Sequence, residues 1–152
     1  MTDKRILSVT AIKDGTVIDH IPAKSLFKVI SILELDKLNT QMTFGTNFKS
    51  KRLGTKALIK ISNKFFKDDE IDKIALVAPE AKLNIIKDYQ VIEKREVEVP
   101  DNIVGIVKCM NPNCVTNNEN VLTKFNVISK KEVTLKCCYC EKITDQEHLK
   151  II

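Results

Sequence analysis

Four cysteines in the last third of the chain constrain its fold more than any other feature of the sequence. Cys109 and Cys114 form a C-x4-C pair, and Cys137 and Cys140 form a C-x2-C pair. Two close pairs separated by 22 residues are typical of a single tetrahedral Zn²⁺ ion held by four thiolates. Such a site leaves no coordination position open for water or substrate, so the pattern predicts an architectural metal rather than a catalytic one.

A fifth cysteine, Cys138, lies between the two members of the second pair. Pairing Cys138 with Cys140 would give C-x-C, a tighter turn than C-x2-C, so we expect Cys137 and Cys140 to be the ligands. The alternative for the four cysteines is a set of ordinary buried thiols. Ligand spacing in both pairs, together with the turn residues 111–113 inside the first pair, favours the metal.

The length and composition of the chain allow a packed core and predict no contact with a membrane. Its 152 residues suit one ordinary domain or two small ones, and 43% of them are hydrophobic. The sequence has no apolar run of about 18 residues and shows no signal peptide, which predicts a cytoplasmic protein. In that reducing compartment, paired cysteines are more often metal ligands than disulfides.

The charge of the chain bears on its partners. The net charge of +5 divides into +4 for residues 1–100 and +1 for residues 101–152. Four thiolates around a Zn²⁺ ion would make the second segment slightly negative. A zinc module that grips nucleic acid through its phosphates should be clearly basic. A zinc-ribbon nucleic-acid-binding protein is therefore the alternative interpretation, and we expect no nucleic-acid partner.

A junction near Pro100 divides the chain into two predicted domains, residues 1–100 and residues 101–152. The order of elements in the first predicts an α+β fold: a ferredoxin-like βαββαβ domain with an extra strand. In that fold two helices cover one face of an antiparallel sheet, and the other face stays free to bind or pair. The pattern predicts strands over 6–12 and 16–19, a helix over 23–35, strands over 41–48 and 57–62, a helix over 68–78, and strands over 83–86 and 89–96.

The second predicted domain is a small antiparallel β structure. Apolar and polar residues alternate over 103–108, 121–128 and 132–136, as in half-buried strands. A sheet of about 50 residues buries too little surface to be secure alone. Because the binding energy of a structural zinc ion contributes to folding, we expect the metal to supply the stability that this small sheet lacks.

A few charged residues in the first domain lie within apolar strands. Lys60 and Lys94 are of this kind, and for each one a solvent-facing position is the default interpretation. A phosphate ligand would need several converging cations, with an acidic group for a ribose hydroxyl; Asp19 and His20 could contribute. The chain contains no phosphate-binding or dinucleotide-binding glycine motif, and its only histidines are His20 and His148. We therefore expect no catalytic residues.

Three segments, 11–23, 58–61 and 135–142, together resemble the regulatory chain of aspartate carbamoyltransferase, and the resemblance runs over essentially the whole chain. It implies a non-catalytic subunit that controls pyrimidine biosynthesis allosterically. The N-terminal domain would bind CTP, UTP or ATP as effectors and pair with a second regulatory chain. The C-terminal zinc domain would dock on the catalytic chain.

The resemblance also implies particular site residues. Lys60 and Asp19 would address the base and ribose, and Lys94 and His20 the phosphates. Spacing alone favours a plain solvated turn between the first two cysteines, whereas the resemblance makes Asn111 and Asn113 contacts of the catalytic chain. Cys138 stands where relatives often carry lysine, and the stretch before Ala11 matches less well. The full implied effector site is Ala11, Ile12, Val17, Asp19, His20, Lys60, Asn84, Ile86, Tyr89, Val91 and Lys94.

Overall fold

A computed structural model describes residues 11–152, so most of the strand predicted over 6–12 lies outside the described residues. Residues 11 and 12 themselves have no regular structure. The first half forms a five-stranded sheet in the order β2-β3-β1-β4-β5, with every neighbouring pair antiparallel. Its strands are β1 (Gly15–Pro22), β2 (Met42–Ser50), β3 (Gly54–Ser62), β4 (Lys82–Lys87) and β5 (Gln90–Glu96).

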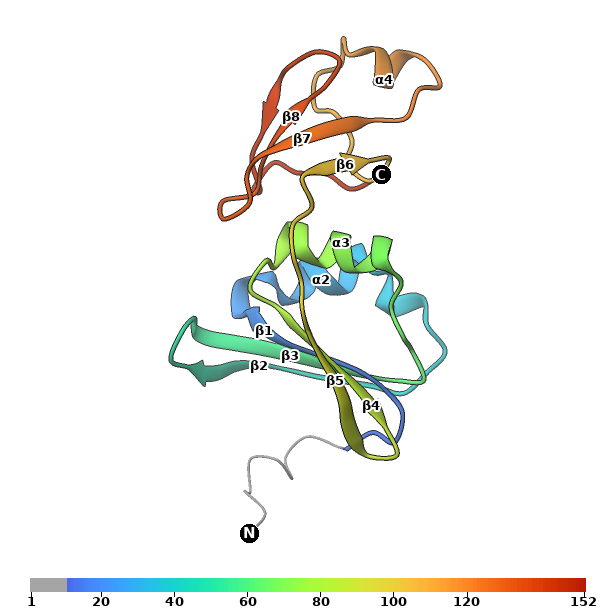
Figure 1. The fold of residues 1–152 in the computed structure, drawn as a ribbon, viewed down its shortest axis with the longest axis vertical. Coiled ribbons are helices and arrows are strands. Elements are labelled where there is room, and N and C mark those ends of the chain that lie inside the picture. Colours follow the sequence, from blue (N-terminus) through green and yellow to red (C-terminus); the bar gives the residue numbers. More distant parts are fainter. Residues whose placement is uncertain (1–10) are drawn as a thin grey trace.

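Two helices cover one face of this sheet (Figure 1). They are α2 (Leu26–Ile32), which follows the short 3-10 turn η1 (Ala23–Ser25), and α3 (Asp68–Val77). The helix predicted over 23–35 stops early because Glu34 adopts a left-handed φ of 52°, after which η2 (Leu35–Lys37) turns the chain. Helix α3 begins as its sequence predicts: the Glu70 side chain accepts a hydrogen bond from the Lys67 N–H (3.0 Å).

The core of the first half lies between the sheet and the helices. Ile18, Ile59 and Ile74 are completely buried, whereas Val17 and Asp19 alternate with Ile18 and face the other side of the sheet. With β1 between β3 and β4, and with the extra strand β5 at the edge, the topology confirms the predicted α+β, ferredoxin-like arrangement.

The second half is a small antiparallel sheet, as predicted, but it has four strands rather than three, because the short strand Ile143–Thr144 was not predicted. Its strands are shorter than the alternation suggests: the chain leaves the sheet at Gly105, where φ is 70°, and residues 105–108 are not in a strand. Phe125 and Leu135 are fully buried at its centre. The elements are β6 (Asn102–Val104), the short helix α4 (Val115–Asn118), β7 (Lys124–Ser129), β8 (Thr134–Cys137) and β9 (Ile143–Thr144).

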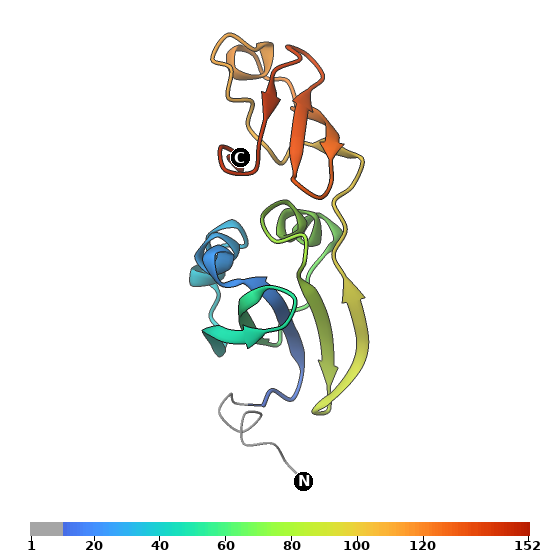
Figure 2. The same cartoon turned by 90° about the vertical axis from the view of Figure 1, so that its left-hand side faces the viewer.

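Helices α2 and α3 lie between the two sheets, as the two perpendicular views show (Figures 1 and 2). Residues 97–101 connect the halves, and Gln146 Nε2 donates a hydrogen bond to the Leu76 carbonyl of α3 (3.0 Å). The helix-free face of the first sheet therefore points away from the second half. Within residues 11–152, no helix has the length and apolar character needed to cross a membrane.

Candidate functional site

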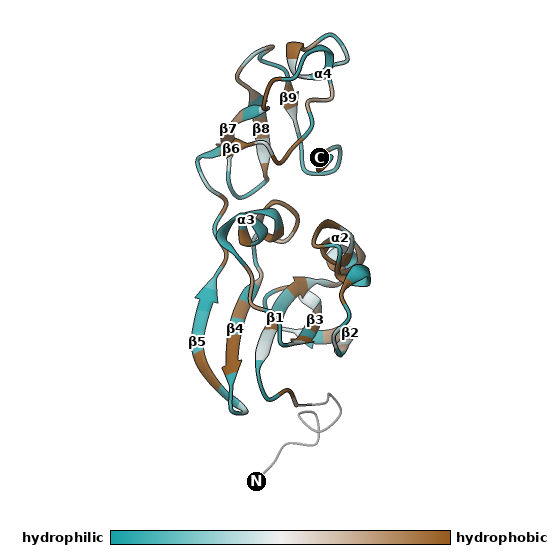
Figure 3. Ribbon diagram, turned by 90° about the vertical axis from the view of Figure 1, so that its right-hand side faces the viewer, coloured by the Kyte–Doolittle hydropathy of each residue, from teal (hydrophilic) through white to brown (hydrophobic). Residues whose placement is uncertain are grey.

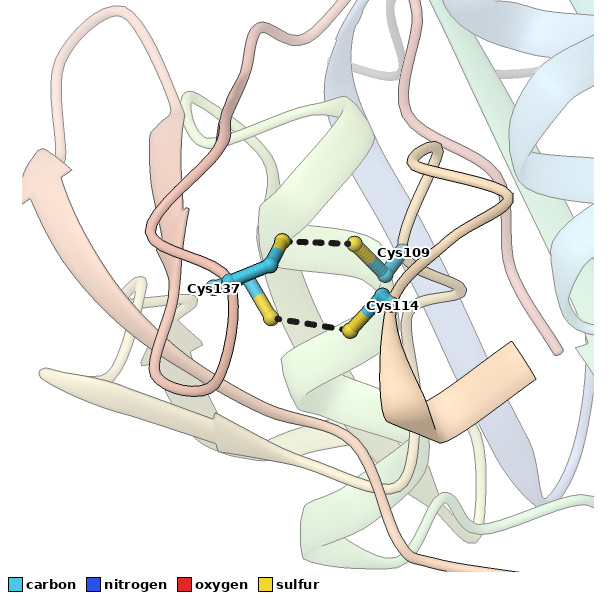
Figure 4. A group of neighbouring side chains, drawn as sticks. Cys109, Cys114 and Cys137 are labelled. Carbon is cyan, nitrogen blue, oxygen red and sulfur yellow. Dashed lines mark hydrogen bonds between the residues drawn. The ribbon is translucent and has the colours of Figure 1, made fainter. Parts of the chain in front are cut away.

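The four predicted metal ligands form one cluster, and Figure 4 shows three of them, Cys109, Cys114 and Cys137, facing one another. The sulfur atoms of Cys109 and Cys140 are 3.5 Å apart, those of Cys114 and Cys137 are 3.8 Å apart, and all four lie within 4.8 Å of one another. Four sulfurs placed tetrahedrally at about 2.3 Å from a zinc ion would be separated by about 3.8 Å. The cluster therefore has the size of a four-thiolate metal site.

The surroundings of the thiols differ across the cluster. Burial raises the pKa of Cys109 to about 12. At Cys140 burial acts in the same direction, but hydrogen bonds from the Lys142 backbone and the Asn111 side chain outweigh it and lower the pKa to about 6. A metal ion binds the thiolate form, so metal binding would draw the protons from all four thiols.

The fifth cysteine lies apart from this cluster. Cys138 is exposed, and its N–H donates to the Lys124 carbonyl (2.9 Å), which keeps the turn in register with β7. The four clustered sulfurs are those of the two predicted pairs.

The loop between the first two ligands is held by asparagine side chains. Asn111 Oδ1 accepts a hydrogen bond from the Asn113 N–H (3.0 Å), and Asn113 is exposed. Asn117 Nδ2 donates to the carbonyls of Cys109 and Asn111 (2.8 Å each), and Asn118 Nδ2 donates to Pro112 (3.0 Å). Sequence reasoning missed Asn117 and Asn118. The sequence feature that could have indicated them is the pair of adjacent asparagines in the short helix α4, directly after the second ligand, Cys114.

A second group of predicted residues lies on the helix-free face of the first sheet. Lys60, Val17, Asn84 and Lys94 are paired directly across β3, β1, β4 and β5, so they form one row. Directly paired residues project to the same side of a sheet. The row therefore presents two lysines, a valine and an amide on one surface, although the four residues come from distant parts of the sequence.

One end of this face is closed by the loop before β1. The Tyr89 N–H donates to the Lys13 carbonyl (3.0 Å), and the Asp88 N–H donates to Asp14 Oδ1 (3.2 Å). These bonds hold the segment that contains Ala11 and Ile12, two further residues of the predicted set, against the turn between β4 and β5. Within the hairpin, Ile86 pairs with Val91.

The other end of the face carries Asp19 and His20 at a β-bulge in β1. Lys56 Nζ lies 3.0 Å from Asp19 Oδ1, and the His20 backbone has a left-handed φ of 58°. Burial lowers the pKa of His20, and the positive charges of Lys56, Lys82 and Arg52 act in the same direction against Asp19. Burial likewise lowers the pKa of Lys60. The face is thus a cationic surface that suits an anion.

Two family models match the chain almost end to end. The allosteric domain of the aspartate carbamoyltransferase regulatory chain matches residues 7–98, and the metal binding domain of the same regulatory chain matches residues 101–150. These matches favour the regulatory-chain interpretation over a nucleic-acid-binding zinc ribbon.

Curated relatives agree with the family models. An aspartate carbamoyltransferase regulatory chain of Bacteroides fragilis is 53% identical over 150 residues, which cover 99% of this chain and 98% of that protein. The regulatory chain of Pyrococcus abyssi is 52% identical over 145 residues, with 94% and 95% covered. That of Thermococcus sibiricus is 54% identical over 140 residues, with 92% and 93% covered. The chain therefore belongs to the family of aspartate carbamoyltransferase regulatory chains, which are non-catalytic subunits.

Proposed function

We propose that this chain binds nucleoside triphosphates on the helix-free face of its first sheet and passes their effect to a catalytic chain of aspartate carbamoyltransferase. The observation that carries the proposal is the row of Lys60, Val17, Asn84 and Lys94 across four strands. It provides Lys94 for phosphates, Lys60 and an amide for a base or ribose, and Asp19 beside them for a ribose hydroxyl. CTP, UTP and ATP are the proposed effectors.

The metal of the second half is proposed to be zinc. Four thiolates are soft ligands, and a closed tetrahedral sulfur site is the usual structural zinc site in proteins. In this proposal, residues 1–100 form the domain with the effector site. Residues 101–152 form the domain that binds the metal and contacts the catalytic chain. Thiolate ligands persist in a reducing compartment, which favours the cytoplasm.

The catalytic-chain contact is proposed to be the surface around the loop between Cys109 and Cys114. Asn113 is exposed there, and Met110 (42% exposed) and Tyr139 (42% exposed) add apolar area. The hydrogen bonds from Asn117 and Asn118 fix the backbone of this loop before a partner arrives. A preorganised loop loses little conformational entropy on docking.

A second regulatory chain is proposed to pair along strand β2. This strand is one edge of the first sheet, and Phe44 on it is 50% exposed. Phe44 packs edge-on against Phe27 of α2, which is 69% exposed, with ring centres 6.3 Å apart. The opposite edge, β5, is hydrophilic over its C-terminal half (Figure 3). An exposed edge strand with aromatic residues is a natural pairing surface, whereas a charged edge resists pairing.

Calorimetric titration of CTP and ATP into Lys60→Ala and Lys94→Ala tests the effector site. Each variant should bind about tenfold more weakly or worse, because each loses a charge-assisted contact to the nucleotide. Lys73→Ala, on helix α3 beyond the other face of the sheet, is the matched control and should bind normally. Unchanged affinity in both Lys60→Ala and Lys94→Ala would falsify the proposed effector site.

A further inference from the structure

Lys82, the first residue of β4, lies at the Asp19 end of the helix-free face and is not part of the predicted effector site. It pairs directly with Asp19 on one side and with Glu96 on the other. Its row is therefore the neighbour of the row that holds Asn84 and Lys94. Diagonal neighbours in adjacent rows are about 7–8 Å apart, which a lysine side chain easily spans. Lys82 thus lies beside Asp19 and diagonal to Lys94, close to His20 and Lys94, the two residues proposed to hold the nucleotide phosphates.

The present partner of Lys82 is held weakly. Lys82 Nζ lies 3.6 Å from Glu96 Oε1, and the two side chains are 38% and 75% exposed. An exposed ion pair of this length contributes little to stability. A phosphate group carries more negative charge than a carboxylate and offers more acceptor oxygens. A phosphate group can therefore replace Glu96 as the ion-pair partner of Lys82 with little loss of folding stability.

A cavity and several positive charges lie next to Lys82. Lys82, Glu96 and Arg52 help to line a cavity of about 440 Å³ at the end of the row, so an anion beside Lys82 has room. Lys56, Lys82 and Arg52 all act on His20 as positive charges. Nδ1 of His20 is buried, 3.5 Å from Asp19 Oδ2, and makes no hydrogen bond with any residue of the described range.

We propose that Lys82 binds the terminal phosphate of the effector and displaces Glu96, so that this site distinguishes nucleoside triphosphates from monophosphates. The assignment rests on the proposed function. It adds to the effector site a residue that distinguishes nucleotides by the length of their phosphate chain. Lys94 and His20 would hold the phosphate nearer the ribose, and Lys82 would extend the cationic surface by one strand position. Glu96 would occupy Lys82 when no triphosphate is bound.

The test is a set of calorimetric titrations of CTP, CDP and CMP into the full-length, metal-loaded chain. Lys82→Gln should weaken CTP binding about tenfold and change CMP binding less than about twofold, because only the longer phosphate chain reaches this position. Glu96→Gln should shift affinity the other way and strengthen CTP binding about twofold to fivefold, since it removes a competing carboxylate. Lys87→Gln is the matched control, because Lys87 lies at the far end of β4 with its amino group over the Phe65 ring.

Selective loss of CTP affinity in Lys82→Gln, with a gain in Glu96→Gln, supports the assignment. An equal loss for CTP and CMP, or no loss for either, overturns it even if the unaltered chain binds all three nucleotides. If the unaltered chain binds no nucleotide, the proposed function fails and the assignment fails with it, which is a different and recognisable result.

Discussion

The cysteine cluster and the proposed effector face, which is the surface around Lys60, Asn84 and Lys94, are built in opposite ways. The four cysteines come from two short turns, and their spacing in sequence almost dictates their meeting in space. The effector face takes one residue from each of four strands, and only the strand register brings Lys60, Asn84 and Lys94 together. The cluster is closed and mostly buried, whereas the face is open. A buried site built from residues close in sequence can stabilise the fold. An exposed site built from residues distant in sequence is accessible to a ligand and can respond to it.

The largest expected effect comes from breaking the cluster. Cys114→Ser removes a buried thiolate, and because metal binding at such sites supplies on the order of 10 kcal/mol of folding energy, the second half should unfold. Hydrogen exchange should show lost protection in β7 and β8 and retained protection in β1 and β3. The exposed Cys138→Ser variant is the control and should keep both the metal and the protection pattern. A folded, metal-loaded Cys114→Ser protein would contradict this account of the cluster.

A smaller effect is expected from the loop that the cluster supports. Asn117→Ala removes two hydrogen bonds to backbone carbonyls, which should destabilise the second half by about 1–3 kcal/mol and weaken binding of a catalytic chain. Denaturant unfolding and a pull-down titration measure the two effects. Gln146→Ala, which loses one hydrogen bond between the halves, is the comparison. If Asn117→Ala unfolds more easily but binds the catalytic chain normally, the loop is not the contact.

On the effector face, removal of a charge should affect binding far more than folding. Asp19→Asn breaks the contact with Lys56 and should change the stability of the first half by no more than about 1 kcal/mol, because that pair is partly exposed. Nucleotide affinity should fall, since the amide is a poorer acceptor for a ribose hydroxyl. Thermal unfolding and calorimetry on the same sample separate the two. Ser50→Ala, in the nearby strand β2, serves as a control for general disturbance of the sheet. Loss of folding without loss of affinity would reverse the role given to Asp19.

The smallest expected effect is on the pH dependence of nucleotide binding. His20 has a lowered pKa, first through burial and then through Lys56, Lys82 and Arg52. A bound phosphate would raise the pKa, so binding should take up protons and affinity should increase as pH falls between the two pKa values. Without nucleotide the sign for folding is opposite: the lowered pKa means that stability is complete above pH 6.5 and declines as pH falls below it.

Calorimetry in buffers of different ionisation enthalpy counts the protons that accompany binding. His20→Asn is the appropriate variant, because asparagine tolerates the left-handed backbone at this position and does not titrate. The variant should lose the proton uptake. An unchanged uptake in His20→Asn would place the responsive group elsewhere on the face.

The same contrast explains what could be predicted from the sequence. The cysteine ligands were predictable because zinc-site spacing is local, and the order of elements followed from periodicity and turn residues. Register was not predictable: the bulge between Ile18 and Ile21, which turns His20 out of the regular strand, has no signal in single-residue patterns. Lys82 was missed because β4 was expected to begin at Leu83, one residue later than it does. The early end of α2 depends on the left-handed Glu34, a residue with no special preference for that conformation.

The metal cluster and the proposed effector face should have separable roles. The most direct measurement is CTP titration into the chain before and after metal removal by a thiol-reactive mercurial, with catalytic-chain binding followed on the same samples. We expect the metal-free chain to bind CTP within about twofold of the loaded chain but no longer to hold the catalytic chain. Loss of CTP binding together with the metal, or retention of the catalytic chain without it, would contradict the account.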